Sequence, residues 1–249
     1  MSPAEPLPPK VYLVPCDLTS NAHTELLYNQ RVTCGWAKEG IERWKSLSAQ
    51  GNLVMYWLVL NDNTPEKDDL IKTHCDRYPN QATPIQDTAA QIWGQERTPS
   101  NDSFIPIGHI GLGRLQPDSE YVVLMKQAQP PAGPTDVVTW VGPFYVSWVM
   151  QRLGIGNFAM TEIERLAASP PVNGTIIALD AIAPDHAMAP ALVRTFYTHF
   201  GNPAPTKSNH DWYLKQGYKP YHRKTAYPWT DIMTGEVNML DTVLMQKRL

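Results

Sequence analysis

Two glycines stand two residues apart at Gly154 and Gly156, directly after an aromatic and β-branched run that covers residues 144–149. Such a run is typical of a buried strand, and helix-forming residues resume at Ala159. A strand, a glycine turn and a helix in this order leave several backbone N–H groups at the helix start, with the positive end of the helix dipole behind them. The pattern therefore predicts an anion site, most often one for phosphate.

Two common phosphate-binding motifs each require a residue that this turn lacks. A P-loop requires a lysine after its last glycine, but Asn157 follows Gly156. A dinucleotide fingerprint requires a third glycine where Ala159 stands. An ordinary glycine-rich turn that binds nothing is the remaining alternative, and the turn alone leaves it open.

The stretch resembles the pyrophosphate-binding motif of the GNAT superfamily of acyl-CoA-dependent N-acyltransferases, which has the pattern Gln/Arg-x-x-Gly-x-Gly/Ala. Gln151, Gly154 and Gly156 match this pattern, whereas Trp148 stands where the family usually has proline. The resemblance implies that the cofactor contacts come from Tyr145, Val146, Trp148, Gln151, Arg152, Leu153, Gly154, Ile155, Gly156 and Asn157.

A second segment, near the C-terminal end of the sequence, resembles the family's late motif, Leu-Tyr-x-Lys-x-Gly-Phe. Tyr213, Gly217 and Tyr218 match it position by position. The asparagine that many members carry seven residues before the tyrosine is replaced by Thr206. The resemblance implies that Tyr213 is the general acid for the departing thiolate, and it covers roughly residues 11–60 and 104–249.

Acylation of an amine also requires that the nitrogen loses its proton. An alkylamine with a pKa near 10 is only about one part in a thousand neutral at pH 7, so a base or a dry pocket must favour the free amine. His109 and Asp180 are candidate bases, although a strand histidine is usually structural and an aspartate at a strand end is usually a turn or cap residue. Glu25, Arg31 and Trp36 are weaker candidates for the acceptor site.

The resemblance also describes how the thioester is held. The pantetheine arm is expected to pair with the end of the strand at 144–149 as though it were another strand. A backbone N–H near Val146 is expected to stabilise the charge that develops on the thioester oxygen.

The elements that must position these residues follow from periodicity and turn signals. The expected strands are 11–15, 53–60, 104–112, 144–149, 174–180, 218–227 and 237–247. The expected helices are about 19–36, 38–49, 155–167, 190–200 and 208–216. In the GNAT family this order implies an α/β (α+β) fold, a central mixed sheet of about seven strands, splayed between strands 4 and 5 and flanked by helices.

The expected domain organisation is simple. Residues 1–10 are rich in proline and predict a flexible tail, and residues 11–249 predict a single GNAT domain. Two segments, at about 61–103 and 184–205, are expected to be insertions. Helices are expected within the first of them, near 66–76 and 85–93.

Composition excludes several classes of function. A net charge of -3 gives no electrostatic reason to bind nucleic acid or an anionic membrane. The longest apolar run, at 53–60, is too short to span a bilayer. Three scattered cysteines and the lack of a signal-peptide pattern favour a reducing, cytoplasmic location with no metal site.

The resemblance implies an N-acetyltransferase that transfers an acetyl group from acetyl-CoA to a primary amine by direct attack in a ternary complex. A small-molecule acceptor is the first expectation and a protein or peptide amine the second, with no metal and with a monomer or homodimer as the assembly. A non-catalytic CoA-binding module and an α/β enzyme that uses the turn for another phosphate are the alternatives.

Overall fold

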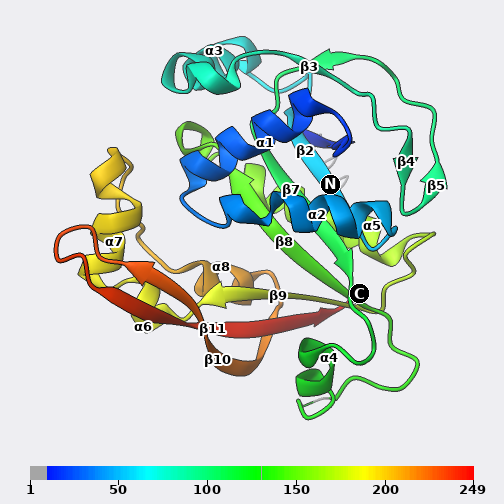
Figure 1. The fold of residues 1–249 in the computed structure, drawn as a ribbon, viewed down its shortest axis with the longest axis vertical. Helices are drawn as coiled ribbons and strands as arrows, with labels where there is room; N and C mark the ends of the chain where they lie inside the picture. Colours follow the sequence, from blue (N-terminus) through cyan, green and yellow to red (C-terminus); the bar gives the residue numbers. More distant parts are fainter. Residues whose placement is uncertain (1–9, 130) are drawn as a thin grey trace, which may run out of the picture. The chain divides into compact units, whose positions relative to one another are not determined.

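A computed structural model describes residues 10–129 and 131–249 (Figure 1). The expected flexible tail at 1–10 lies outside the described residues except for Lys10. The chain divides into two compact units. The first unit is Met1–Gly113 with Val141–Val172, and the second unit is Arg114–Trp140 with Asn173–Leu249. That they form a single domain with two insertions remains a prediction.

Seven strands form one mixed sheet, hydrogen-bonded in the order β1-β2-β7-β8-β9-β11-β10. The strands are β1 Val11–Pro15, β2 Leu53–Leu60, β7 Gly108–Arg114, β8 Val138–Val146, β9 Ile176–Ile182, β10 Lys219–Thr230 and β11 Val237–Arg248. Strand β8 begins in the second unit and ends in the first. It pairs in parallel with β9 over Val138–Trp140, whereas the β1–β2, β2–β7, β9–β11 and β10–β11 pairs are antiparallel. The expected mixed sheet of seven strands is confirmed; the splay remains a prediction.

The first unit is built around β2, whose eight residues are all buried. A strand buried on both faces reads as an unbroken apolar run, which is how the sequence predicted it. Helices α1 Asn21–Cys34 and α2 Ile41–Ala49, separated by the 3-10 helix η1 Lys38–Gly40, lie over β2 and β7 (Figure 1). Leu27, Ile41 and Trp44 bury their side chains in this core, and Leu47 packs against it. Helix α1 ends because Gly35 adopts a φ of 84°, a conformation that favours glycine.

Two glycines let β7 approach β8 closely. A Cβ atom on Gly108 would lie 2.2 Å from the carbonyl oxygen of Tyr145, and one on Gly111 would lie 2.2 Å from that of Gly142. Neither contact is sterically tolerable, so both positions exclude a side chain. The expected weakening of this strand by glycine therefore reflects a close approach of two backbones.

The segment at 61–103 differs from its prediction in part. Helix α3 Lys67–Arg77 is confirmed and is followed by the 3-10 helix η2 Pro79–Gln81. The prediction of a helix near 85–93 is wrong, because this stretch contains two short strands. Strand β3 Ile85–Gln86 pairs with β6 Ser103–Phe104. Strand β4 Gln91–Ile92 pairs with β5 Gln95–Glu96. Trp93 and Gly94 both have positive φ, as a two-residue hairpin turn requires, and a helix cannot pass through such residues.

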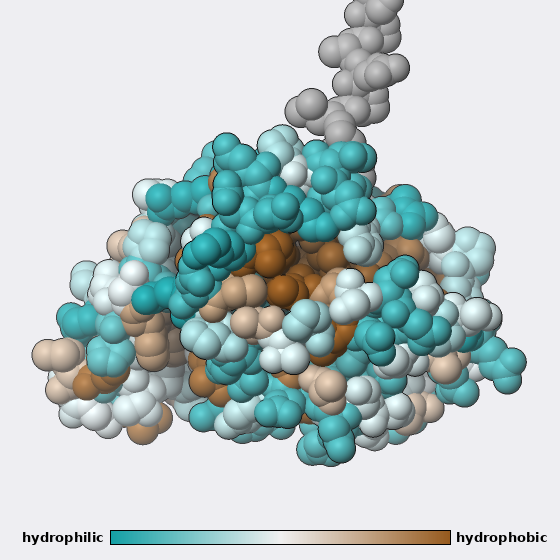
Figure 2. Space-filling view, turned by 90° about the horizontal axis from the view of Figure 1, so that it is seen from above, coloured by the Kyte–Doolittle hydropathy of each residue, from teal (hydrophilic) through white to brown (hydrophobic). Residues whose placement is uncertain are grey.

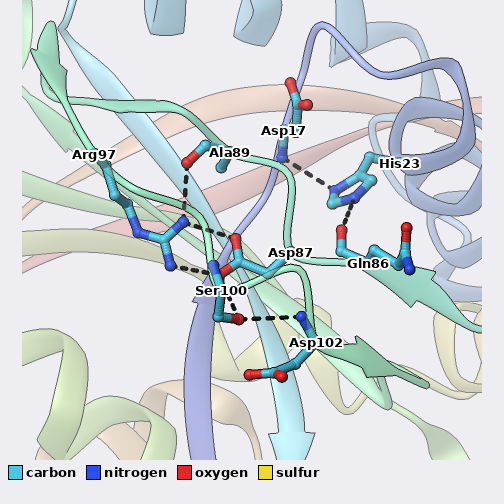
Figure 3. Close-up of polar contacts among 8 residues, drawn as sticks. All are labelled: Asp17, His23, Gln86, Asp87, Ala89, Arg97, Ser100 and Asp102. Carbon is cyan, nitrogen blue, oxygen red and sulfur yellow. Dashed lines mark hydrogen bonds and ion pairs between the residues drawn. The ribbon is translucent and has the colours of Figure 1, made fainter.

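A buried ion pair fixes the second part of this segment (Figure 3). The Asp87 carboxylate is 3% exposed and accepts two hydrogen bonds from the Arg97 guanidinium and two from the backbone and hydroxyl of Ser100. Burial alone would raise the pKa of Asp87, but the hydrogen bonds from Arg97 and Ser100 outweigh it and hold the pKa below its usual value. His23 of α1, which lies outside the segment, also holds it in place, because its Nε2 lies 2.8 Å from the carbonyl oxygen of Gln86.

The second unit packs helices on β9, β10 and β11. They are α4 Glu120–Met125, α6 Pro184–Ala187, α7 Pro190–Phe196, η4 Thr198–Phe200 and α8 Asn209–Lys215. Val122 and Met125 of α4 share a core with Val138, Ile176 and Ala178. Helix α4 was not expected from the sequence, since six residues are too few to show helical periodicity.

The surface is mainly hydrophilic on the face that Figure 2 shows, with hydrophobic residues visible between the hydrophilic ones. Across residues 10–129 and 131–249, no helix is long and apolar enough to cross a membrane. The same residues contain no group of three or more His, Cys, Asp or Glu side chains that could hold a metal ion.

Three histidines are buried in the first unit: His23, His74 and His109. Nδ1 of His23 accepts hydrogen bonds from the backbone N–H of Asp17 and the indole N–H of Trp57, so its single proton is on Nε2. Burial lowers the pKa of all three imidazoles, to about 4 for His74. All three are therefore neutral in the folded protein at neutral pH.

The replacement Gly111→Ala is expected to destabilise the protein by at least ~2 kcal/mol, because β7 and β8 would have to separate to admit the new Cβ atom. Gly133→Ala is the control, since a Cβ atom there meets its nearest neighbour, Asp136 Oδ2, at 3.6 Å. Its effect is expected to stay within about 0.5 kcal/mol. Urea unfolding of both variants measures the difference, and equal stabilities would contradict the close approach.

The free energy of unfolding is expected to fall as the pH drops from about 6.5 to 5. The folded pKa values of His23, His74 and His109 lie below the value near 6.5 of the unfolded chain, so the unfolded state binds protons first. Each histidine can contribute up to ~1.4 kcal/mol per pH unit to the loss. Urea titrations across this range measure the slope, which His109→Asn should reduce by about one proton. The exposed His222→Asn should leave it unchanged; a flat profile for the wild type would contradict the expectation.

Candidate functional site

Strand β8 ends earlier than the sequence predicts. The strand stops at Val146, and the 3-10 helix η3 Trp148–Met150 follows, although residues 144–149 were expected to be extended. Tertiary contacts override strand propensity here: Met150 is fully buried and the Trp148 indole N–H donates to the carbonyl oxygen of Thr33 at 3.1 Å.

The exit of the strand is held at Ser147, which is fully buried. Its backbone N–H donates to the carbonyl oxygen of Ile107 at 2.8 Å, and its hydroxyl lies 2.8 Å from Nδ1 of His74. Successive residues of a strand direct their N–H and C=O groups to opposite edges. The Tyr145 C=O faces Gly108 of β7, and the Ser147 N–H donates to Ile107 just before β7, so the N–H and C=O of Val146 point away from β7. This is the orientation that the role expected for Val146 requires.

The turn after η3 has the geometry of an anion site. Arg152 has a φ of 68° and Gly154 one of 82°, and helix α5 Ile155–Ala168 begins directly afterwards. The N–H groups of Asn157 and Phe158 donate to the carbonyl oxygen of Gly154, so those of the preceding residues lie ahead of the first helical hydrogen bond. A Cβ atom on Gly154 would meet no atom within 4 Å, which shows open space beside the turn.

Positive charge lies next to this turn. Nζ of Lys10 donates to the carbonyl oxygen of Leu153 at 2.8 Å, and the side chain of Arg152 is exposed. The Gln151 amide donates to the carbonyl oxygen of Val146 at 3.3 Å and so ties the turn to the strand end. Two cations and the N-terminus of α5 therefore favour an anion here.

The residues expected to bind the cofactor thus form one continuous segment of the first unit. Only some of them are available to a ligand through their side chains. Tyr145 is buried, and Trp148 uses its indole N–H within the protein. Residues 151–153 are exposed.

His109 lies on β7 and is 1% exposed. Its Nε2 lies 3.4 Å from the Arg31 guanidinium, which can only donate, and its Nδ1 lies 2.8 Å from Oε1 of Gln30. Burial and then the charge of Arg31 lower its pKa well below the usual value. Because both ring nitrogens are occupied, this geometry does not support the role of base, which remains a prediction.

The weaker acceptor-site candidates are spread over the end of α1. Arg31 is 4% exposed, donates to the carbonyl oxygen of Trp36 at 2.7 Å and lies over the ring of Trp44. Glu25 is exposed on the helix surface. Arg31 and Trp36 therefore lie together.

Tyr213 and Asp180 lie in the second unit. Burial and then the charge of Asp180 raise the pKa of Tyr213 above its usual range, so the phenol stays protonated. Burial also raises the pKa of Asp180, while a hydrogen bond from the hydroxyl of Tyr227 at 2.9 Å opposes the rise. The structure thus gives electrostatic coupling between the predicted acid and one of the predicted bases.

Two local sequence features position helix α8, which carries Tyr213. The Ser208 hydroxyl accepts from the N–H of Asp211 and caps the helix start. Gly217, with a φ of 90°, ends it and lets the N–H of Tyr218 reach the carbonyl oxygen of Tyr213.

Sequence reasoning missed His74, Gln81 and Tyr227. Each lies outside the two motifs, and a single polar residue in a short helix or a long strand carries no spacing signal. Their partners, Ser147 for His74, Thr33 for Gln81 and Asp180 for Tyr227, are distant in the chain, so only the folded structure shows the contacts.

Comparison with known proteins places the fold. No protein-family model matches the sequence, and no curated protein matches it either. Solved structures do match. Arabidopsis thaliana NAA60 in complex with a bisubstrate analogue is similar over 96% of this chain and 97% of that chain, at 10% identity and a TM-score of 0.51.

Two further structures match over similar lengths. The aminoglycoside 6'-N-acetyltransferase from Enterococcus faecium has 14% identity and a TM-score of 0.46 over 95% of this chain and 96% of that chain. A GNAT family acetyltransferase from Elizabethkingia anophelis with acetyl-CoA bound has 10% identity and a TM-score of 0.47 over 96% and 99%. At sequence identities this low, the similarity shows the fold alone. With its mixed seven-stranded sheet and the match to NAA60, this chain has the fold of the GNAT superfamily of N-acetyltransferases.

Proposed function

We propose that this protein is an acetyl-CoA-dependent N-acetyltransferase that acts on a primary amine of a small molecule. The observation that carries the proposal is the turn at Arg152 and Gly154, with its positive φ angles and open space, directly between the end of β8 and the start of α5. The fold supports it, because it is the fold of the GNAT superfamily of N-acetyltransferases.

Acetyl-CoA fits the chemistry of this segment. Its pyrophosphate would receive backbone N–H groups from residues 152–156 and lie near the Lys10 ammonium and the start of α5. Its pantetheine arm carries amide groups that can pair with the edge of β8 to which Val146 directs its N–H and C=O. Neither interaction requires a specific side chain, which agrees with the buried side chain of Tyr145.

The reaction is a direct transfer. The neutral amine nitrogen attacks the thioester carbonyl carbon, a C–N bond forms, and the C–S bond breaks to release the thiolate. The N–H of Val146 stabilises the oxygen that becomes negative in between. The nitrogen must lose one proton and the sulfur must gain one, so free CoA and an amide are the balanced products. Positioning of the two substrates supplies much of the remaining rate enhancement.

Two residues of the second unit are assigned to these protons. Tyr213 gives its proton to the departing sulfur, since its raised pKa keeps the phenol protonated at neutral pH. Asp180 receives the proton from the nitrogen, and its raised pKa makes it a better base than an exposed carboxylate. The pairing of His109 with Gln30 and Arg31 argues for a structural role instead.

We also propose a cytoplasmic location. Cys16, Cys34 and Cys75 are free thiols in the structure, which is typical of proteins from a reducing compartment.

Gly154→Glu is expected to weaken acetyl-CoA binding by roughly tenfold or more, because a carboxylate would face the pyrophosphate. Gly235→Glu is a matched control: Gly235 also has positive φ and open space around its Cβ position, so the backbone strain is similar. Calorimetric titration with acetyl-CoA and CoA measures both affinities. Failure of the wild type to bind either ligand, or equal weakening in the two variants, would refute the proposal.

Tyr213→Phe is expected to lower kcat by about 10²-fold while leaving acetyl-CoA affinity within about twofold. Tyr28→Phe, a change at an exposed tyrosine, should alter neither quantity. Release of free thiol from acetyl-CoA, with primary amines and with a short peptide as acceptors, provides the rate. An unchanged kcat would remove Tyr213 from the mechanism, and binding without turnover by the wild type would favour the non-catalytic module.

A further inference from the structure

Five residues of the first unit are connected by hydrogen bonds and by the chain itself, and we call this set the polar ring. His74 of α3 contacts the hydroxyl of Ser147 at 2.8 Å. The Gln81 amide nitrogen of η2 donates to the hydroxyl of Thr33 at 2.7 Å, and the Thr33 carbonyl oxygen accepts from Trp148 at 3.1 Å. Ser147 and Trp148 are neighbours in the chain, so the contacts join the inserted segment, the end of α1 and the exit of β8.

Two buried polar atoms of the ring have no hydrogen-bond partner within the described part of the chain. They are Nε2 of His74 and Oε1 of Gln81, on side chains that are both 0% exposed. A buried polar atom left unsatisfied costs about 1–3 kcal/mol, so such atoms usually face water or a ligand. Two of them within one ring, beside the exit of β8, indicate a ligand-binding function.

The orientation of the Gln81 amide follows from its partner. The Thr33 hydroxyl has a single hydrogen, which it donates to the carbonyl oxygen of Asn29 at 3.0 Å. It must therefore accept from the Gln81 amide nitrogen, and the atom that remains is the carbonyl oxygen Oε1. The unsatisfied atom of Gln81 is thus a hydrogen-bond acceptor.

The imidazole of His74 can offer a second acceptor. Burial lowers its pKa to about 4, and no charged group contributes to that shift. A neutral imidazole has one donor and one acceptor nitrogen. With the proton on Nδ1, donated to the Ser147 oxygen, Nε2 presents a lone pair. The ring contains no carboxylate, so its surroundings disfavour a cationic ligand.

We propose that the polar ring binds the acceptor amine in its uncharged form, with the amine N–H groups donated to His74 Nε2 and Gln81 Oε1. This inference rests on the proposed function. A neutral primary amine has two hydrogens and one lone pair, so two acceptors can hold the hydrogens while the lone pair stays free to attack. Ser147 of the ring directly follows Val146, whose N–H is assigned to the thioester oxygen.

The ring also indicates which amines are preferred. The centroid of the Tyr78 aromatic ring lies 5.6 Å from that of the His74 imidazole, and Trp148 adds a second aromatic surface. Aromatic and uncharged polar groups together favour a primary amine on an aromatic or apolar group over a polyamine. The inserted segment would then select the substrate, whereas the glycine turn binds the cofactor.

The experiment uses 2-phenylethylamine as the probe and spermidine as the polycationic comparison. Gln81→Met removes the acceptor oxygen and keeps the side-chain length. It is expected to raise KM for 2-phenylethylamine by roughly tenfold or more, with acetyl-CoA affinity within about twofold. Gln86→Met is the control, since it makes the same change at an exposed side chain of the same inserted segment. It should leave both quantities unchanged.

Two further variants keep the inference falsifiable if one does not fold. His74→Phe is expected to raise KM as Gln81→Met does. Gln81→Glu keeps an acceptor but adds a negative charge, so it is expected to shift the preference toward spermidine. Melting temperatures of all variants separate loss of folding from loss of binding.

The outcomes separate this inference from the proposed function. An unchanged KM in Gln81→Met, no binding of 2-phenylethylamine to the wild-type complex with CoA, or a wild-type preference for spermidine would each overturn the polar ring as the amine site. Failure of the wild type to bind acetyl-CoA would instead contradict the proposed function. Calorimetric titration of the amine without cofactor would then still test the ring.

Discussion

The exit of strand β8 is the constraint on which the candidate site depends. Ser147 is fixed from two sides, by the carbonyl oxygen of Ile107 and by the imidazole of His74, and Trp148 is tied to α1. A strand directs alternate backbone groups to opposite edges, so a slip of one residue would turn Val146 toward β7. The same exit sets where the turn at Arg152 and Gly154 begins and therefore where α5 presents its N-terminus.

The segment at 61–103 matches neither family motif, yet it contributes much of this constraint. It is long for a connection between two strands, and ordering it costs conformational entropy at every residue. The buried pair of Asp87 and Arg97, the Gln86 carbonyl bonded to His23, and the contact between His74 and Ser147 offset that cost. A segment anchored in this way can hold polar side chains in fixed positions beside the strand exit, which a mobile loop cannot do.

The three places that the proposed reaction uses differ in their charge. Cations and a helix N-terminus lie at the turn proposed for the pyrophosphate. The polar ring has no carboxylate, and the pKa of His74 is lowered by burial alone. In the second unit, burial and then the charge of Asp180 raise the pKa of Tyr213 and keep its phenol protonated. Each environment favours one charge state of its proposed ligand, and this is how a single fold can bind an anion, an uncharged amine and a leaving thiolate.

The sequence by itself determined the order of the seven sheet strands along the chain, most of the helices between them, the turn at Gly154 and the helix end at Gly217. Period, propensity and glycine conformation are local properties. It also gave Tyr213 as a candidate general acid, which remains a prediction, and the structure adds its coupling to Asp180. Only the tertiary structure decided that β8 stops at Val146, that residues 85–93 contain two short strands in place of a helix, and that His109 is paired on both nitrogens. The polar ring belongs to the same group, since Gln81 meets Thr33 and His74 meets Ser147 across long stretches of chain. Such contacts are set by packing between distant segments, and no local pattern records them.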